Sequence, residues 1–212
     1  MIIVVLVFPW CRAGNRSRQS REGTDKTVYI IKKLKINLKE QLSARIYMPD
    51  IRRVLRYVKG DEERKQELYN LLFNSDNRVS YYAGWIMSHF SKKENKWLFS
   101  RQDKLIDLAM TCEHPGLRRQ VLTILYRQPL ADLERVDFLD FCLEGMFSSQ
   151  QPLAVQSLCI KIAHELCRSI PELQRELRAA LEMMDDQELS PAIRAAKRNV
   201  LHVMKTGKRL KR

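Results

Sequence analysis

The sequence predicts an all-α protein built as a short α-solenoid of about four helix pairs, preceded by N-terminal helices. A helix-start signal recurs at Asn77, Pro115, Pro152 and Pro191, at intervals of 38, 37 and 39 positions. Self-similarity at that period is typical of repeat arrays in which each helix pair covers the apolar face of the next. The composition agrees, because 45% hydrophobic residues with only 7 Gly and 7 Pro suit a mainly helical protein.

Residues 1–25 are expected to form a disordered leader. The apolar run from Ile2 to Phe8 resembles a signal peptide, but no basic segment precedes it and no small-residue cleavage site follows it. It is also far shorter than the ~20 residues that span a bilayer. We therefore expect a cytoplasmic protein without a transmembrane segment. Residues 12–23 are polar and lack periodicity, which is typical of disorder.

Residues 26–60 are expected to form helices that cap the array. Between Lys26 and Tyr47, apolar residues recur every three or four positions with lysines between them, which predicts a basic amphipathic helix. Such a helix also suits an anionic membrane surface, although the capping role is preferred. A third interpretation places the native start at Met48, where the charge changes abruptly. From Met48, a shorter helix with one apolar stripe is expected to end near Gly60.

Residues 61–204 are expected to form the repeat domain. First helices are predicted over 62–74, 96–112, 133–147 and 171–184, and second helices begin at the four recurring start signals. Asp76 and Ser190 have the side chains of good N-caps, and Pro191 suits the first helical position because its missing N–H costs nothing there. In the first two helix pairs, the second helix carries an apolar stripe at matching positions. These are Val79, Ala83, Ile86 and Met87, then Leu117, Val121, Ile124 and Leu125.

The starts of two second helices share the pattern Pro, any residue, apolar residue, Arg: Pro115-Gly116-Leu117-Arg118 and Pro191-Ala192-Ile193-Arg194. This pattern resembles HEAT-like repeats over roughly residues 61–204. The other two units depart from it, since Val155 stands where the Arg is expected and Arg78 precedes Val79. The resemblance implies a right-handed solenoid whose second helices line a concave surface, together with a scaffold or adaptor function.

A protein or peptide is the partner that we expect on this surface. Residues 48–204 carry 23 Lys and Arg against 22 Asp and Glu, so the body of the chain is almost neutral and favours a mixed polar and aromatic interface. The resemblance places side chains from all four second helices near this groove. The candidates are Arg78, Tyr82, Trp85, Arg118, Arg119, Gln156, Arg194 and Arg198.

The alternative function is DNA binding or base excision, because the architecture is similar to that of the bacterial DNA alkylation repair glycosylases. That family implies a basic concave face and a carboxylate beside aromatic residues. Asp76, Tyr81 and Trp85 are candidate parts, with Tyr82, Arg118 and Arg119, but none matches the family's catalytic motif residue by residue. The near-neutral body argues against it, because DNA affinity depends heavily on phosphate neutralisation.

The basic excess of the chain lies at its ends. Residues 1–47 carry 10 basic against 3 acidic side chains, and residues 205–212 carry 5 against none, which accounts for most of the formal charge of +13. Nucleic acid or another anionic surface is therefore a possible partner of the ends. The candidates in the basic tail, residues 205–212, are Lys205, Lys208, Arg209, Lys211 and Arg212.

Other chemistry finds no support in the sequence. Phosphate-binding loops, dinucleotide fingerprints and the nucleophile-elbow motif are all missing. The five cysteines have no metal-ligand spacing, and four of them, Cys112, Cys142, Cys159 and Cys167, fall within apolar helical patterns that predict core positions. We therefore expect no cofactor, no metal site and no catalytic residues.

Overall fold

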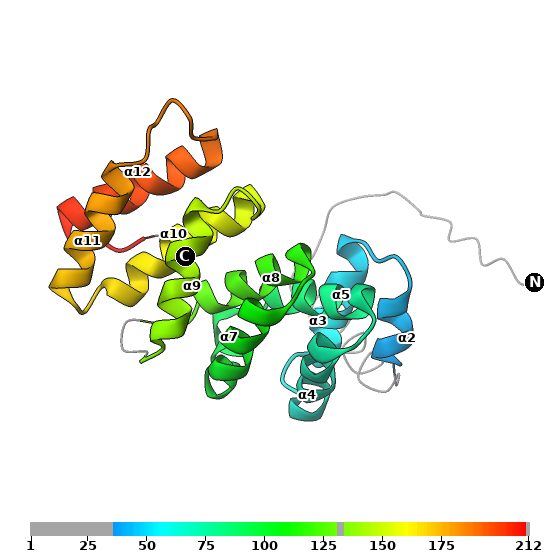
Figure 1. Ribbon diagram of the computed structural model, residues 1–212. Helices are drawn as coiled ribbons and strands as arrows, with labels where there is room; N and C mark the ends of the chain where they lie inside the picture. Colours follow the sequence, from blue (N-terminus) through cyan, green and yellow to red (C-terminus); the bar gives the residue numbers. More distant parts are fainter. Residues whose placement is uncertain (1–35, 131–133, 211–212) are drawn as a thin grey trace, which may run out of the picture. The chain divides into compact units, whose positions relative to one another are not determined.

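The computed structural model describes residues 36–130 and 134–210, and over these ranges the chain forms eleven α-helices, two 3-10 helices and no strands (Figure 1). Residues 37–212 belong to one compact unit. The predicted all-α class is confirmed. The predicted leader, residues 1–25, and the last two residues of the basic tail lie outside the described residues.

Two N-terminal helices precede the array, α2 (Leu38–Ser43) and α3 (Met48–Val58). The single helix predicted over 26–47 is wrong in its described part, because α2 begins only after Asn37 and ends at Ser43. The Asn37 backbone is extended, and its side chain accepts a hydrogen bond from the Glu40 amide at 3.2 Å. The rest of that predicted helix lies outside the described residues. As predicted, α3 ends before Gly60, which has a φ of +73°.

Four sequential helix pairs follow, as predicted. The first helices are α4 (Glu62–Asn70, continued by the 3-10 helix Leu71–Phe73), α7 (Gln102–Thr111), α9 (Val136–Phe147) and α11 (Pro171–Glu182). The second helices are α5 (Asn77–Ser88), α8 (Pro115–Tyr126), α10 (Leu153–Cys167) and α12 (Pro191–Thr206). Each first helix, or its 3-10 extension, packs on the second helix that follows it.

Two first helices begin later than predicted. The helix expected from Lys96 starts at Gln102 and is preceded by α6 (Lys92–Lys96) and a second 3-10 helix (Phe99–Arg101). At this break Leu98 is completely buried, and the side-chain amide of Asn95 donates a hydrogen bond to the Arg127 carbonyl oxygen at 3.3 Å. The helix expected from Leu133 starts at Val136, since Arg135 is non-helical and its side chain binds aspartates of α7 and α9.

The predicted N-caps are confirmed at two second helices. The Asp76 carboxylate accepts the Arg78 backbone N–H at 2.8 Å, and the Ser190 hydroxyl accepts that of Ile193 at 3.4 Å. No local pattern predicts a cap from His114, yet its Nδ1 accepts the Leu117 N–H at 3.0 Å. Each cap accepts a hydrogen bond from a backbone N–H that has no partner within the first turn, which stabilises the fold by about 1 kcal/mol.

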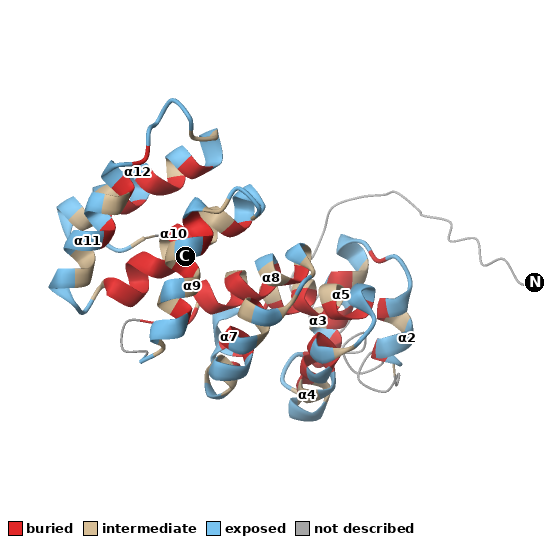
Figure 2. Cartoon of the chain, viewed as in Figure 1, coloured by how far each residue is buried: buried red, intermediate tan, exposed pale blue. Residues whose placement is uncertain are grey.

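The second helices form the continuous core of the array. Neighbours in the order α5, α8, α10 and α12 pack on one another, and the longest buried stretches lie on α8 and α10 (Figure 2). All eight residues of the two predicted apolar stripes are buried. In the described part of the chain, no helix is long and apolar enough to cross a membrane.

Candidate functional site

The side chains of the second helices that do not enter the core share one surface, which we call the second-helix face. On α5 the buried positions include Val79, Ala83 and Met87, whereas Tyr82 and Trp85 stay half-buried and Arg78 is exposed. Because each second helix packs on the next, the outward residues of α5 and α8 are neighbours on this face.

An aromatic cluster occupies the α5 end of the second-helix face. Tyr81 stacks on Trp85 with ring centroids 6.3 Å apart and an interplanar angle of 26°. Tyr82 lies 5.3 Å from Tyr81 and 6.2 Å from Trp85, and His89 meets the Trp85 ring edge-on at 6.3 Å. His114 extends the cluster to α8, with its ring 5.5 Å from Tyr81. We call these five residues the aromatic cluster.

Gly116 allows α8 to approach the aromatic cluster closely. A Cβ at this position would lie 2.8 Å from His114 Cε1 and 3.0 Å from Tyr81 Cε2. Any side chain would therefore displace one of these rings. The Nδ1 atom of the same His114 ring accepts the N-cap hydrogen bond from the Leu117 N–H, which fixes the orientation of the ring.

Two predicted arginines are exposed one helical turn from residues at the cluster, Arg78 before Tyr81 on α5 and Arg119 after Gly116 on α8, and two other predicted residues hold the fold. Arg78 is exposed and donates one hydrogen bond to the Ser43 carbonyl oxygen at 3.1 Å, and Arg119 is exposed on α8. Arg118 instead turns inward, because its guanidinium donates to the Ala109 and Cys112 carbonyl oxygens at the end of α7 and to the Gln151 side chain. Gln156 donates to the Gln151 carbonyl oxygen at 2.7 Å.

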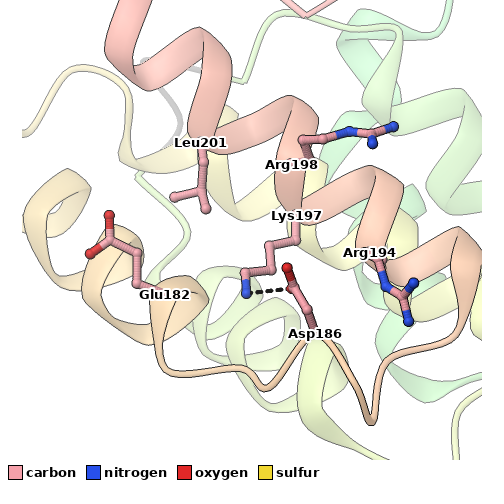
Figure 3. A pocket seen from close by; sticks show the side chains of 6 residues that line it. All are labelled: Glu182, Asp186, Arg194, Lys197, Arg198 and Leu201. Atoms are coloured by element: carbon pink, nitrogen blue, oxygen red, sulfur yellow. Dashed lines mark hydrogen bonds and ion pairs between the residues drawn. The ribbon is translucent and has the colours of Figure 1, made fainter.

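The predicted residues of α12 line a charged pocket of about 330 Å³ between α11 and α12. Figure 3 shows Arg194 and Arg198 extending from α12 away from Glu182, whereas Lys197 points to Asp186. The buried Lys197 ammonium donates to Asp186 Oδ1 and to the Met184 carbonyl oxygen, each at 2.7 Å. This hydrogen bond lowers the pKa of the Asp186 carboxyl. The lysine thus fixes the loop between α11 and α12.

A family model for the HEAT repeat domain matches residues 38–204, which include α2 to α11 and most of α12. This chain belongs to the HEAT repeat family. No curated protein and no solved structure matches it. The match begins earlier than the predicted repeat region, since it takes in α2 and α3, and no finding links this HEAT domain to the alkylation repair glycosylases.

Several charged residues that stabilise the HEAT domain were missed from the sequence. Arg127 donates to the Ser88 and Phe90 carbonyl oxygens at the end of α5, at 2.7 and 2.6 Å. Arg135 joins Asp107 of α7 to Asp137 of α9, which raises the pKa of its guanidinium. Arg127 could have been found from its position directly after a second helix, because a cation there can reach the free carbonyl groups at a helix end.

Neither a group of metal ligands nor an exposed cysteine thiol is present among the described residues. Among the described residues, no three His, Cys, Asp or Glu side chains gather in a group that fits a metal. Cys142, Cys159 and Cys167 are buried and Cys112 is half-buried. Burial raises the pKa of the Cys142 thiol well above its ordinary value and that of Cys167 to about 11, so both are protonated near neutral pH.

The basic tail continues directly from the HEAT domain. Lys205 lies in the last turn of α12, and Gly207 follows the helix with a φ of +66°. Lys208 and Arg209 are exposed beyond this turn. Lys211 and Arg212 lie outside the described residues.

Proposed function

We propose that this HEAT domain is a non-catalytic adaptor that binds a protein partner on its second-helix face, with the aromatic cluster at the centre of the interface. The observation that carries the proposal is the set of half-buried rings held in contact on that face. Membership of the HEAT repeat family supports it, because HEAT domains are typically protein-binding scaffolds.

The rings suit an interface for two physical reasons. Tyr and Trp are enriched among the residues that dominate binding energies, and so is Arg. Tyr82 and Trp85 also contact each other and Tyr81, so little side-chain freedom remains to be lost when a partner covers them. A partner that covers these rings gains apolar contact area on side chains that are already ordered.

Exposed arginines give the interface a polar rim. Arg78 and Arg119 are exposed one helical turn from residues at the aromatic cluster, and Arg194 and Arg198 extend from α12 farther along the array. Arg118 and Gln156 are left out of the proposed contact surface, since their polar groups are used in bonds between helices. Their role is to hold α8 and α10 in the geometry that presents the other residues.

Affinity purification of the full chain from cells that produce it tests the proposal. Wild-type protein is compared with Trp85→Ala/Arg119→Ala, which removes one ring and one exposed cation from the face. The matched control is Phe147→Ala, which removes an exposed aromatic ring at the end of the first helix α9. We expect one or more proteins to be enriched with the wild type and the control and absent with the double variant.

Folding of each variant is checked by circular dichroism, and any protein that the double variant fails to retain is then titrated against the purified chain. We expect at least about a tenfold weaker affinity for Trp85→Ala/Arg119→Ala, as for interface anchors in general. Recovery of the same proteins in the same amounts with all three chains would contradict the proposed site.

A further inference from the structure

A second pocket on the array brings together cationic side chains from two separate parts of the chain, α10 and the basic tail. It has a volume of about 420 Å³ and lies where the ends of α8 and α12 meet α10. Its polar and aromatic lining consists of Tyr126, Lys161, Asn199, His202, Lys208 and Arg209. We call it the basic pocket.

Gly207 brings the tail to the basic pocket. Its φ of +66° is in the left-handed region, so the chain turns back directly after α12 (Figure 1). Residues 208–210 thereby line the pocket. A Cβ on Gly207 would meet no atom within 4 Å. Substitution there changes the backbone preference and leaves the neighbouring side chains in place.

Among the described residues, no carboxylate neutralises the charge of the basic pocket. None of its lining residues is an Asp or a Glu, and the ion pairs of the described residues include none of Lys161, Lys208 and Arg209. The Lys161 ammonium lies over the Tyr126 ring, 6.0 Å from its centroid, which is the outer limit of a cation–π interaction.

Other enclosed cations of this fold are bound by carboxylates or, like Arg118 and Arg127, by carbonyl oxygens at helix ends. Lys197 binds Asp186, Lys65 lies against Glu62 and Glu94, and Arg135 binds three aspartates. A pocket of three cations without an acid stands apart from this pattern. The three cations repel one another, and an anion between them would offset that repulsion. A ligand with several negatively charged oxygens would therefore complete the site.

We infer that the basic pocket binds an acidic segment of the partner protein, through clustered Asp, Glu or phosphorylated side chains. The inference rests on the proposed adaptor function. A pocket of this size holds the ends of a few side chains, and Lys161, Lys208 and Arg209 supply charged donors while Asn199 supplies an amide. A peptide suits it better than a nucleic acid, because residues 48–204 carry almost no net charge with which to follow a phosphate backbone.

The test is a fluorescence anisotropy titration of the full chain with three probes. The first is a ten-residue peptide that alternates Glu with Ser, the second is the same peptide with phosphoserine at the Ser positions, and the third replaces every Glu of the first with Gln. We expect the two acidic peptides to bind and the Gln peptide not to bind. The comparison of the first two peptides shows whether phosphate groups add to the affinity that carboxylates alone provide.

Three variants assign the binding to the basic pocket. Lys161→Gln/Lys208→Gln removes two pocket cations and is expected to weaken binding of the acidic peptide about tenfold, as expected when charge-assisted hydrogen bonds are removed. Lys92→Gln/Lys93→Gln removes the same net charge from the exposed first turn of α6 and should weaken it less than about twofold, because exposed charges at a distance are screened by salt. Gly207→Val keeps every charge but disfavours the turn, so affinity should fall by about threefold or more.

Equal losses of affinity for Lys161→Gln/Lys208→Gln and Lys92→Gln/Lys93→Gln would overturn the proposal. Non-specific electrostatic attraction to the whole chain would then explain the binding. A single-stranded RNA of equal charge that binds as tightly and with the same variant dependence would assign the pocket to nucleic acid instead. Trp85→Ala/Arg119→Ala is expected to leave peptide binding unchanged. Failure of the aromatic site and failure of the basic pocket therefore give different results.

Discussion

At the scale of single residues, the enclosed cations of this HEAT domain serve mainly to join helix ends. Arg118 donates to carbonyl oxygens at the end of α7, and Arg127 does the same for α5. Lys197 reaches the Met184 carbonyl oxygen after α11. The last carbonyl groups of a helix have no partner within the helix, so a cation supplied by the next helix satisfies them and fixes the packing.

Arg127→Met tests this role, because methionine keeps an apolar stem but cannot donate. The substitution removes two charged hydrogen bonds to carbonyl groups at the end of α5, so we expect the free energy of unfolding to fall by about 2–4 kcal/mol. Urea unfolding followed by circular dichroism measures the change. Arg119→Met is the matched control, since Arg119 is exposed on α8, the helix that Arg127 directly follows, and its replacement should cost less than about 0.5 kcal/mol. Equal effects of the two substitutions would count against the role of Arg127.

The pair between Asp186 and Lys197 gives the second prediction at this scale, a dependence of stability on pH. The hydrogen bond from Lys197 lowers the pKa of Asp186 below its ordinary value of 3.8. The unfolded chain therefore binds the proton at higher pH than the folded chain does. The stabilisation is complete above the unfolded pKa and disappears as the pH falls through the folded pKa.

We expect Asp186→Asn to be less stable than the wild type at pH 6, and the difference to shrink as the pH falls below about 3.8. Thermal unfolding from pH 6 to pH 2.5 measures it. Glu188→Gln is a control for the general effect of acid, since Glu188 is an exposed carboxylate in the same loop. A difference between wild type and Asp186→Asn that stays constant over this range would show that the ion pair is not its source.

At the scale of elements, α9 and α10 pack closely at a point where a glycine permits it. A Cβ on Gly145 would lie 2.9 Å from Cys159 Sγ, in a region where Cys142 and Cys159 are fully buried. The two helices approach at this point because one of them has no side chain. The sequence shows the glycine, but only the packed structure shows what it meets.

Gly145→Ala should lower the free energy of unfolding by about 1–3 kcal/mol through overpacking, even though alanine favours helix more than glycine does. Cys159→Ala in the same chain removes the sulfur that the new methyl group meets. The double variant should therefore be more stable than the sum of the two single effects predicts, and a double-mutant cycle by urea unfolding measures this coupling. Additive effects would mean that the contact with Cys159 Sγ is not what Gly145 avoids.

The sequence predicted elements whose determinants are local. The starts of α5 and α12 follow from the capping side chains of Asp76 and Ser190, and the buried stripe of α8 follows from helical periodicity. It did not predict the late start of α7, because the break before it depends on the bond between Asn95 and Arg127, which are 32 positions apart. Local patterns carry no information on such contacts.

The same distinction applies to the candidate site. Tyr82, Trp85 and Arg119 could be chosen from the sequence, since they lie outside the apolar stripes and the resemblance to HEAT-like repeats implies a shared surface on the second helices. The pattern that suggested Arg118 is equally local, but the guanidinium turns to the end of α7 and to Gln151. Whether an arginine faces a partner or its own neighbouring helix depends on free carbonyl groups that the helix pattern does not reveal.

At the scale of the whole molecule, the separation of charge decides which partners the chain can hold. Residues 48–204 are close to neutral, whereas residues 1–47 and 205–212 carry most of the net charge of +13. Non-specific nucleic-acid binding increases with the number of phosphates that cations neutralise. Any such binding by this protein should therefore depend on its ends and not on the second-helix face.

Gel-shift titrations of a single-stranded DNA over a series of salt concentrations test this division. The full chain is compared with a variant that lacks residues 1–36 and carries Gln at the five basic positions of the tail, which lie in 205–212. We expect weaker binding and a smaller dependence of log K on log salt, by about 0.7 for each phosphate of a single strand that the variant no longer neutralises. An unchanged salt dependence would place the phosphate-binding cations on the HEAT domain itself. That result would favour the DNA-binding alternative over a protein-binding adaptor, because the second-helix face would then have to supply the cations.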